Sequence, residues 1–187
     1  MQRKYTKSAQ KVLENTGKQA VSFGHNFVGT EHLLLSLLVT KGVASEVLKE
    51  NGVSYDKIAE LIEDNLTSDS GVLVADRSEF TPRVKKIITN SAAEAERLGA
   101  SSVGTEHILI ALLKETDCIA MRLLNTKGIN VQKLYVDVLT ASGQDATSAK
   151  NEYMMQKGRK NKSATPMLDQ YSRDLTAFAR EDRLDPV

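Results

Sequence analysis

An internal duplication constrains the fold of this 187-residue chain more than any other feature. When the sequence is shifted by 75 positions, residues 6–38 align with residues 81–113, and 13 of the 33 aligned pairs are identical. One inserted residue near Thr116 then changes the offset to 76, and the similarity continues through Gly52 and Gly128. A repeat of this length is not a thin solenoid unit, so we expect two copies packed about a pseudo-two-fold axis.

Each copy has the apolar spacing of four short helices, which predicts an all-α fold. The first helix of each copy follows a capping threonine, Thr6 or Thr81, and stops at a left-handed glycine, Gly24 or Gly99. The second opens at Thr30 or Thr105, the third covers residues 43–51 or 118–127, and the fourth starts after Ser54 or Asn130. We therefore expect a pseudo-two-fold bundle of two four-helix repeats.

The domain boundaries follow from the same pattern. Repeat 1 is expected at 4–66, an inter-repeat loop at 67–79 with a brief extended piece near 72–74, and repeat 2 at 80–142. Residues 143–164 are polar and basic without apolar periodicity, which predicts a flexible linker. Residues 165–187 begin with Thr165-Pro166 and have an amphipathic pattern, which predicts a helix that opens a further module.

Composition excludes several functional classes. The 25 Lys and Arg residues balance 24 Asp and Glu residues, which argues against a nucleic-acid partner. The single cysteine, Cys118, cannot form an internal disulfide, and this fits a reducing compartment, by default the cytoplasm. The longest apolar stretch, residues 33–39, is too short for a membrane span, so no membrane partner is expected.

The most specific motif is Gly-Thr-Glu-His, which occurs at residues 29–32 and again at 104–107. One interpretation is structural: the glycine allows an unusual backbone angle, the threonine caps a helix, and the glutamate complements the helix dipole. The other interpretation is functional, because a solvent-facing glutamate in a first turn can grip a guanidinium through two hydrogen bonds. The candidate site residues are Glu31 and Glu106, supported by Gly29, Thr30, His32, Gly104, Thr105 and His107.

A second duplicated feature is an aromatic residue followed by a capping threonine, Tyr5-Thr6 and Phe80-Thr81. Its structural interpretation is a hydrophobic staple with a cap. Its functional interpretation is an anion site, because free N–H groups at a helix start attract phosphate. If these starts lie near Glu31 and Glu106, each copy offers an anion pocket beside a carboxylate.

Enzymatic interpretations find little support. Neither motif histidine belongs to a His-Glu-x-x-His pattern, and His25 aligns with Ala100, so we expect no metal site. Cys118 aligns with Val43 and is expected to behave as a small apolar residue. No Gly-x-x-x-x-Gly-Lys-Ser/Thr sequence occurs, so we expect no catalysis and no cofactor in this chain.

The repeated Gly-Thr-Glu-His unit, the Phe80-Thr81-Pro82-Arg83 start and the Gly24-His25-Asn26 turn resemble the double Clp N-terminal repeat, most nearly that of the ClpC-type Hsp100 unfoldases of Gram-positive bacteria. Residues 165–187 resemble the entry into the first AAA+ module of that family. The resemblance implies a parent ATPase that uses ATP and Mg²⁺, acts as a hexamer and feeds a Clp peptidase.

The resemblance also implies a role for this chain: a movable docking domain for unfolded substrates and for adaptors of the MecA or McsB type. It implies binding of phosphoarginine, a degradation mark, with Glu31 and Glu106 holding the guanidinium. Thr6, Thr81, Tyr5 and Phe80 on the phosphate or peptide side are inferred from the helix starts alone. The alternative is a scaffold that binds adaptors without recognising phosphoarginine. We expect the isolated chain to be monomeric.

Overall fold

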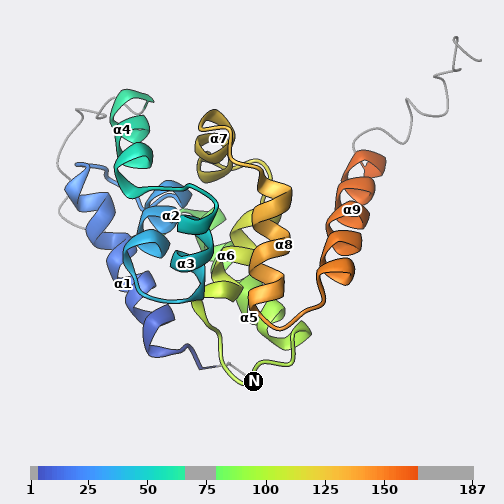
Figure 1. Ribbon diagram of the computed structural model, residues 1–187. Coiled ribbons are helices and arrows are strands. Elements are labelled where there is room, and N and C mark those ends of the chain that lie inside the picture. The colour runs from blue at the N-terminus through green and yellow to red at the C-terminus, as the bar shows by residue number, and fades with distance from the viewer. Residues whose placement is uncertain (1–3, 66–78, 164–187) are drawn as a thin grey trace, which may run out of the picture. The chain divides into compact units, whose positions relative to one another are not determined.

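The computed structural model describes residues 4–65 and 79–163, and the side chains among them except those of residue 65 and residues 156–163. The chain divides into two compact units, residues 1–150 and 151–187. The described residues of the first unit form eight complete helices, four from each repeat, and the start of a ninth, which confirms the expected all-α class (Figure 1). The expected loop at 67–79, apart from its last residue, and the expected helix at 165–187 lie outside the described residues.

Repeat 1 comprises α1 (Lys7–Ser22), α2 (Thr30–Val39), α3 (Val43–Glu50) and α4 (Tyr55–Asn65). Repeat 2 comprises α5 (Pro82–Arg97), α6 (Thr105–Lys114), α7 (Ile119–Thr126) and α8 (Val131–Ala141). The first helices begin as expected: the Thr6 and Thr81 side chains accept hydrogen bonds from Ala9 N at 3.2 Å and Val84 N at 3.4 Å. Gly24 and Gly99 follow the ends of these helices, and both have a positive φ of 70°.

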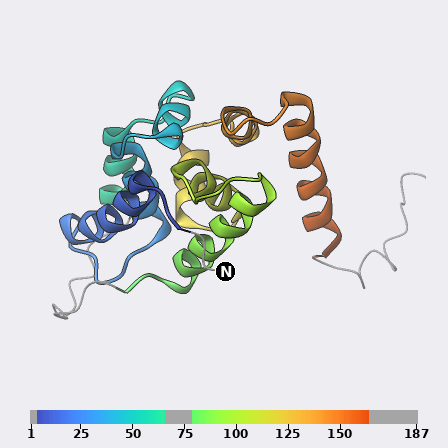
Figure 2. The same ribbon diagram turned by 90° about the horizontal axis from the view of Figure 1, so that it is seen from below.

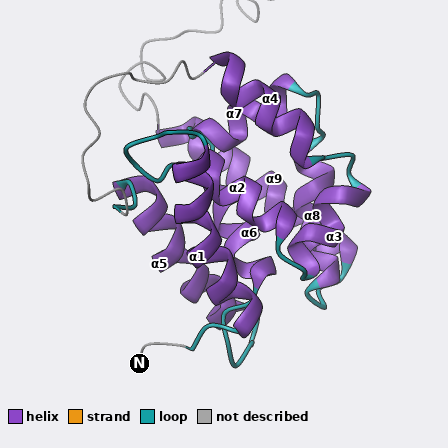
Figure 3. Cartoon of the chain, turned by 90° about the vertical axis from the view of Figure 1, so that its left-hand side faces the viewer, coloured by secondary structure: helices purple, strands orange, loops and turns teal. Residues whose placement is uncertain are grey.

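The core is built around α2 and α6, which lie at the centre of the bundle (Figures 1 and 3). Almost every residue of both helices is buried, including Leu34 and its counterpart Leu109. A helix that is apolar on all sides must be covered on all sides. Each is flanked by the first helix of its own repeat, α1 or α5, and the two also contact each other.

The repeats interlock rather than stand side by side. Helix α3 of repeat 1 packs on α6 and α8, while α7 of repeat 2 packs on α2 and α4. Figure 3 shows α3 beside α8 and α4 beside α7, and Figure 2 shows the same bundle from below. Two parallel β-bridges also connect the repeats, one between Tyr5 and Val103 and the other between Val28 and Phe80. Each repeat therefore contributes helices to the packing of the other.

Helix α9 (Ala146–Ser163) lies within residues 143–164, for which the sequence predicts a flexible linker. Its sequence lacks an apolar stripe but contains good helix formers, and intrinsic propensity does not require a buried face. Asp145 caps its start, because Oδ2 accepts hydrogen bonds from Thr147 N at 3.0 Å and Ser148 N at 3.1 Å. None of the described helices is long and apolar enough to cross a membrane.

Candidate functional site

The two Gly-Thr-Glu-His motifs form the first turns of α2 and α6 in the same geometry. The helix cap is the glycine and not the threonine that the sequence suggested: Gly29 and Gly104 are the N-caps, and each helix begins one residue later. Neither glycine has an unusual backbone angle, since φ is −94° at Gly29 and −95° at Gly104. Those values suit any residue, so the glycines must have another function.

That function is to make room for the glutamate. The carboxylate of each motif glutamate folds back over the preceding turn, and a β-carbon at Gly29 would collide with Glu31 Oε1. A β-carbon at Gly104 would collide with Glu106 Oε1 in the same way. The missing β-carbon of each glycine therefore leaves the space that the glutamate carboxylate occupies.

The motif histidines close the helix starts. The backbone N–H of Gly29 donates to His32 Nδ1 at 2.9 Å, and that of Gly104 donates to His107 Nδ1 at 2.8 Å. This is the reciprocal half of a capping box, with imidazole in the place of the usual Glu or Gln. Histidine at this position thus has a structural function that sequence reasoning missed.

The hydrogen bond from Gly29 also fixes the tautomer of His32. Because Nδ1 accepts, the proton of the neutral ring is on Nε2, which donates to His25 Nδ1 at 2.8 Å. Burial lowers the pKa of His32 to about 3, and the neighbouring His25 acts in the same direction. Glu31 Oε1 lies 3.4 Å from His32 Nδ1. Since this nitrogen has no proton, the contact is not an ion pair.

His25, Glu31 and His32 also place potential metal-ligand atoms within 4.8 Å of one another. A metal on His32 Nε2 would move the ring proton to Nδ1, where the Gly29 N–H already points. A metal on Nδ1 would displace that N–H directly. The hydrogen bonding of His32 therefore does not suit a metal ligand.

The two glutamates differ in exposure. The Glu31 side chain is 1% exposed, whereas that of Glu106 is 21% exposed. The expectation of two equally solvent-facing glutamates is therefore wrong for Glu31. Near it, Phe23, His25 and His32 form an aromatic cluster, with the two imidazole centroids 4.9 Å apart.

Glu31 is a buried acceptor without a donor. Neither carboxylate oxygen has a hydrogen-bond partner among the described residues. Burial raises the pKa of this carboxyl group, and the Glu31 N–H and Thr30 hydroxyl oppose the shift without reaching good hydrogen-bond geometry. A buried carboxylate in this state is costly unless a donor or cation joins it.

The start of each first helix lies beside the motif of the other repeat. Thr6 N donates to Val103 O at 2.9 Å and Val103 N donates to Lys4 O at 2.9 Å, which places the start of α1 next to the Glu106 motif. Thr81 N donates to Val28 O at 3.0 Å, which places the start of α5 next to the Glu31 motif. Each motif thus lies beside the start of a first helix, and that helix comes from the other copy of the repeat.

The aromatic residues at these starts belong to the same cross-repeat contacts. Tyr5 pairs with Val103, and its hydroxyl donates to Ile88 O of α5 at 3.2 Å. Phe80 pairs with Val28, and its backbone precedes the capping Thr81. Both are half-buried. Cys118 is buried at the start of α7, and burial raises the pKa of its thiol, as suits an apolar role.

The interlocked repeats and their matched acidic motifs define a helical double-repeat domain. The chain belongs to the Clp repeat (R) N-terminal domain family, whose model matches residues 4–127 and 79–175. This confirms the resemblance found in the sequence.

Named relatives agree with that membership. The negative regulator of genetic competence ClpC/MecB of Bacillus subtilis (strain 168) is 40% identical over 185 residues, which cover 98% of this chain and 22% of that protein. ClpC of Staphylococcus aureus (strain USA300), named an ATP-dependent Clp protease ATP-binding subunit, is 37% identical over 183 residues, which cover 97% and 22%. The chain therefore spans about a fifth of the length of these relatives.

Solved structures share the fold. The N-terminal domain of ClpD from Arabidopsis thaliana superposes with a TM-score of 0.62 at 23% identity, covering 74% of this chain and 96% of that one. A complex of the ClpV N-domain with a VipB peptide gives a TM-score of 0.54 at 22% identity, covering 71% and 82%. At these identities the comparisons support the fold alone.

Proposed function

We propose that this chain is the docking domain of a ClpC-type, ATP-dependent protein unfoldase that feeds a Clp peptidase in the cytoplasm. It receives unfolded or phosphoarginine-marked substrates and adaptors of the MecA or McsB type. The isolated domain is a monomer, and the parent is a hexamer that binds ATP and Mg²⁺. The names of the relatives support this proposal, and the sites suggest how it works.

The observation that carries the proposal is that each motif glutamate belongs to a helix start that lies beside the first-helix start of the other repeat. Phosphoarginine carries a guanidinium and a phosphoryl group on the same side chain. A carboxylate matches the planar N–H donors of the first, and free backbone N–H groups match the second. Glu106 with the start of α1, and Glu31 with the start of α5, supply both halves.

The two sites are not equivalent in this proposal. Glu106 is partly open to solvent, so a guanidinium reaches it without rearrangement, whereas Glu31 must first be uncovered. The helix starts differ as well, because Pro82 at the first position of α5 has no N–H to donate. Both differences favour the Glu106 site as the tighter one.

Calorimetry with a peptide that contains phosphoarginine, and with the same peptide containing arginine, tests the function. The double variant Glu31→Ala/Glu106→Ala is expected to lose binding of the phosphorylated peptide while its circular dichroism spectrum stays unchanged. Undiminished affinity would contradict the proposal. Normal adaptor binding by a wild-type domain that does not bind the phosphorylated peptide would instead favour the adaptor-only scaffold.

A further inference from the structure

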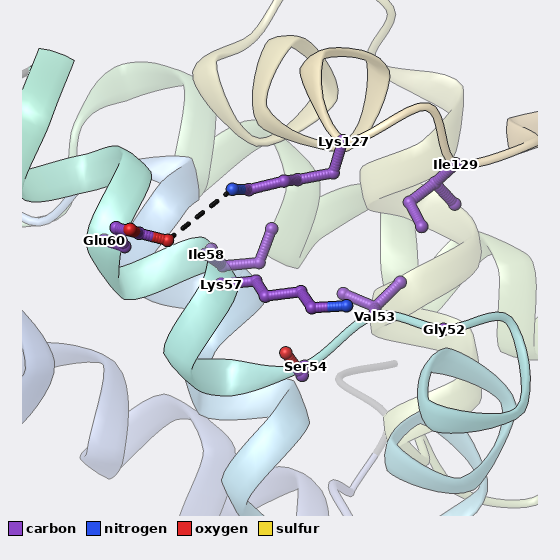
Figure 4. A pocket seen from close by; sticks show the side chains of 8 residues that line it. All are labelled: Gly52, Val53, Ser54, Lys57, Ile58, Glu60, Lys127 and Ile129. Carbon is purple, nitrogen blue, oxygen red and sulfur yellow. Dashed lines mark ion pairs between the residues drawn. The ribbon is translucent and has the colours of Figure 1, made fainter.

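A pocket of about 300 Å³ lies between repeat 1 and repeat 2, at the junction of the α3–α4 turn with the end of α7 (Figure 4). Its walls are partly apolar, and they include lysines from both repeats. The lining residues are Gly52, Val53, Ser54, Lys57, Ile58, Glu60, Lys127 and Ile129.

Two lysines reach over this pocket, one from each repeat. Figure 4 shows Lys57 extending across it from α4 and Lys127 reaching over it from the end of α7. Lys127 Nζ lies 3.8 Å from Glu60 Oε2, but the Glu60 side chain is 68% exposed, and such a surface pair contributes little. No ion pair connects Lys57 to another residue in the described part of the chain. The charged residues that line the pocket, two lysines and one glutamate, therefore give it a net positive charge.

The pseudo-two-fold axis relates this pocket to an equivalent place at the other end of the bundle. The group that lies there indicates what can bind between Lys57 and Lys127. With the offset of 76, Lys57 corresponds to Lys133 and Lys127 corresponds to Asn51. At that end of the bundle, Asp137 Oδ2 accepts hydrogen bonds from Lys133 Nζ at 2.7 Å and from Asn51 Nδ2 at 2.8 Å. The chain's own carboxylate thus fills the equivalent place.

We call the place occupied by Asp137 the closed end and the pocket the open end. At the open end, no carboxylate stands at the position equivalent to Asp137. Asp137 corresponds to Leu61, so α4 supplies no acid at this position. In addition, the amide of Asn51 is replaced by a second cation, Lys127. The pocket therefore has one more cation than the equivalent place around Asp137, and its one acid, Glu60, stands where the other repeat has Val136 rather than Asp137.

We propose that this pocket binds a carboxylate from outside the chain, supplied by an Asp or Glu side chain in an acidic, partly apolar segment of a protein partner. The carboxylate takes the place that Asp137 has at the closed end, between the ammonium groups of Lys57 and Lys127. Neighbouring apolar side chains of the partner contact Val53 and Ile129. The proposal does not depend on phosphoarginine binding, because none of its residues belongs to those sites.

The test uses the ¹⁵N-labelled chain and two blocked peptides, acetyl-Ala-Leu-Glu-Leu-Ala-amide and the same peptide with Gln in place of Glu. We expect the Glu peptide to shift the amide signals of Gly52, Val53 and Ile129, and the Gln peptide to leave them nearly unchanged. Lys57→Gln and Lys127→Asn are each expected to weaken binding about tenfold, as the loss of one charge-assisted hydrogen bond implies. Lys133→Gln at the closed end is the matched control and should leave binding unchanged.

Three results would overturn the proposal. Equal shifts with the Gln peptide would show that charge is not recognised. Unchanged affinity in both lysine variants would place binding elsewhere. Inorganic phosphate saturating the same amides at lower concentrations than the Glu peptide would indicate a general anion site rather than a carboxylate site.

Discussion

The hydroxyl oxygen of Thr30 accepts a hydrogen bond from the backbone N–H of Ala120 at 3.3 Å, across 90 residues of sequence. Thr105 makes the equivalent contact with Ala44 N at 3.4 Å. Ala44 and Ala120 are the second residues of α3 and α7, whose own N-caps, Gly42 and Cys118, provide no side-chain hydrogen bond. Each motif threonine therefore caps a helix of the other repeat and joins the two copies.

Removing this hydroxyl should destabilise the whole domain. Thr30→Val keeps the shape of the side chain but leaves the Ala120 N–H without its acceptor, so we expect a loss of about 1 kcal/mol in the free energy of unfolding, and the same for Thr105→Val. Urea denaturation measures the change. Thr30→Ser retains the hydroxyl and should cost clearly less. A serine variant as unstable as the valine variant would contradict the capping function.

Gly29→Ala should displace the Glu31 carboxylate. Because the new β-carbon collides with Oε1 in a buried site, we expect a loss of about 1–2 kcal/mol in unfolding free energy. Gly104→Ala should cost less, since the Glu106 carboxylate can move toward solvent. In a Glu31→Ala background the Gly29→Ala substitution should cost much less than it does alone.

Gly17→Ala is the matched control for that pair of variants. Gly17 lies inside α1, and a β-carbon there would meet no atom within 4 Å. The change should stabilise the domain by about 0.5–1 kcal/mol, because glycine is a poor helix residue. If Gly29→Ala did not lower the free energy of unfolding relative to Gly17→Ala, the Glu31 carboxylate would not require a glycine at position 29.

The tautomer of His32 should be visible by nitrogen NMR. Its ring is expected to stay neutral, with the proton on Nε2, down to a pH of about 3, which is where burial has moved its pKa. The unfolded chain takes up this proton near the ordinary value of 6.5, so His32 makes stability fall as the pH decreases from about 6.5 toward 3. A His32 ring that titrates near 6.5 in the folded protein would contradict the assigned hydrogen bonds.

Glu31 should act on stability in the opposite direction. Burial raises the pKa of its carboxyl group, so the folded state holds this proton to higher pH than the unfolded state does. The contribution of Glu31 therefore falls as the pH rises from its ordinary value of 4.5 through the raised one. At pH 7, Glu31→Gln should stabilise the domain by about 1–3 kcal/mol, as expected when a buried charge without a partner is neutralised. Denaturation at pH 5 and pH 7 measures this, and a destabilised glutamine variant at pH 7 would contradict it.

The sequence predicted the helices well because their signals are local. A capping threonine such as Thr6, a terminal glycine such as Gly24 and an apolar period each act within a few residues. The cross-repeat contacts could not be predicted in this way, since nothing near Thr30 indicates that its partner is Ala120. The burial of Glu31 was missed for the same reason, because its surroundings are assembled in three dimensions. Helix α9 could not be predicted from periodicity, because its sequence has no apolar stripe.

We propose that the two cross-repeat sites bind phosphoarginine with unequal strength. Titration of the ¹⁵N-labelled chain with free phosphoarginine tests it most directly. We expect the amides of Lys7, Ser8 and Gly104, around the Glu106 site, to shift at lower ligand concentrations than those of Gly29 and Arg83, around the Glu31 site. Glu106→Ala should abolish the first set alone. Shifts confined to other parts of the chain, or both sets persisting in Glu31→Ala/Glu106→Ala, would show that phosphoarginine does not bind at these two sites.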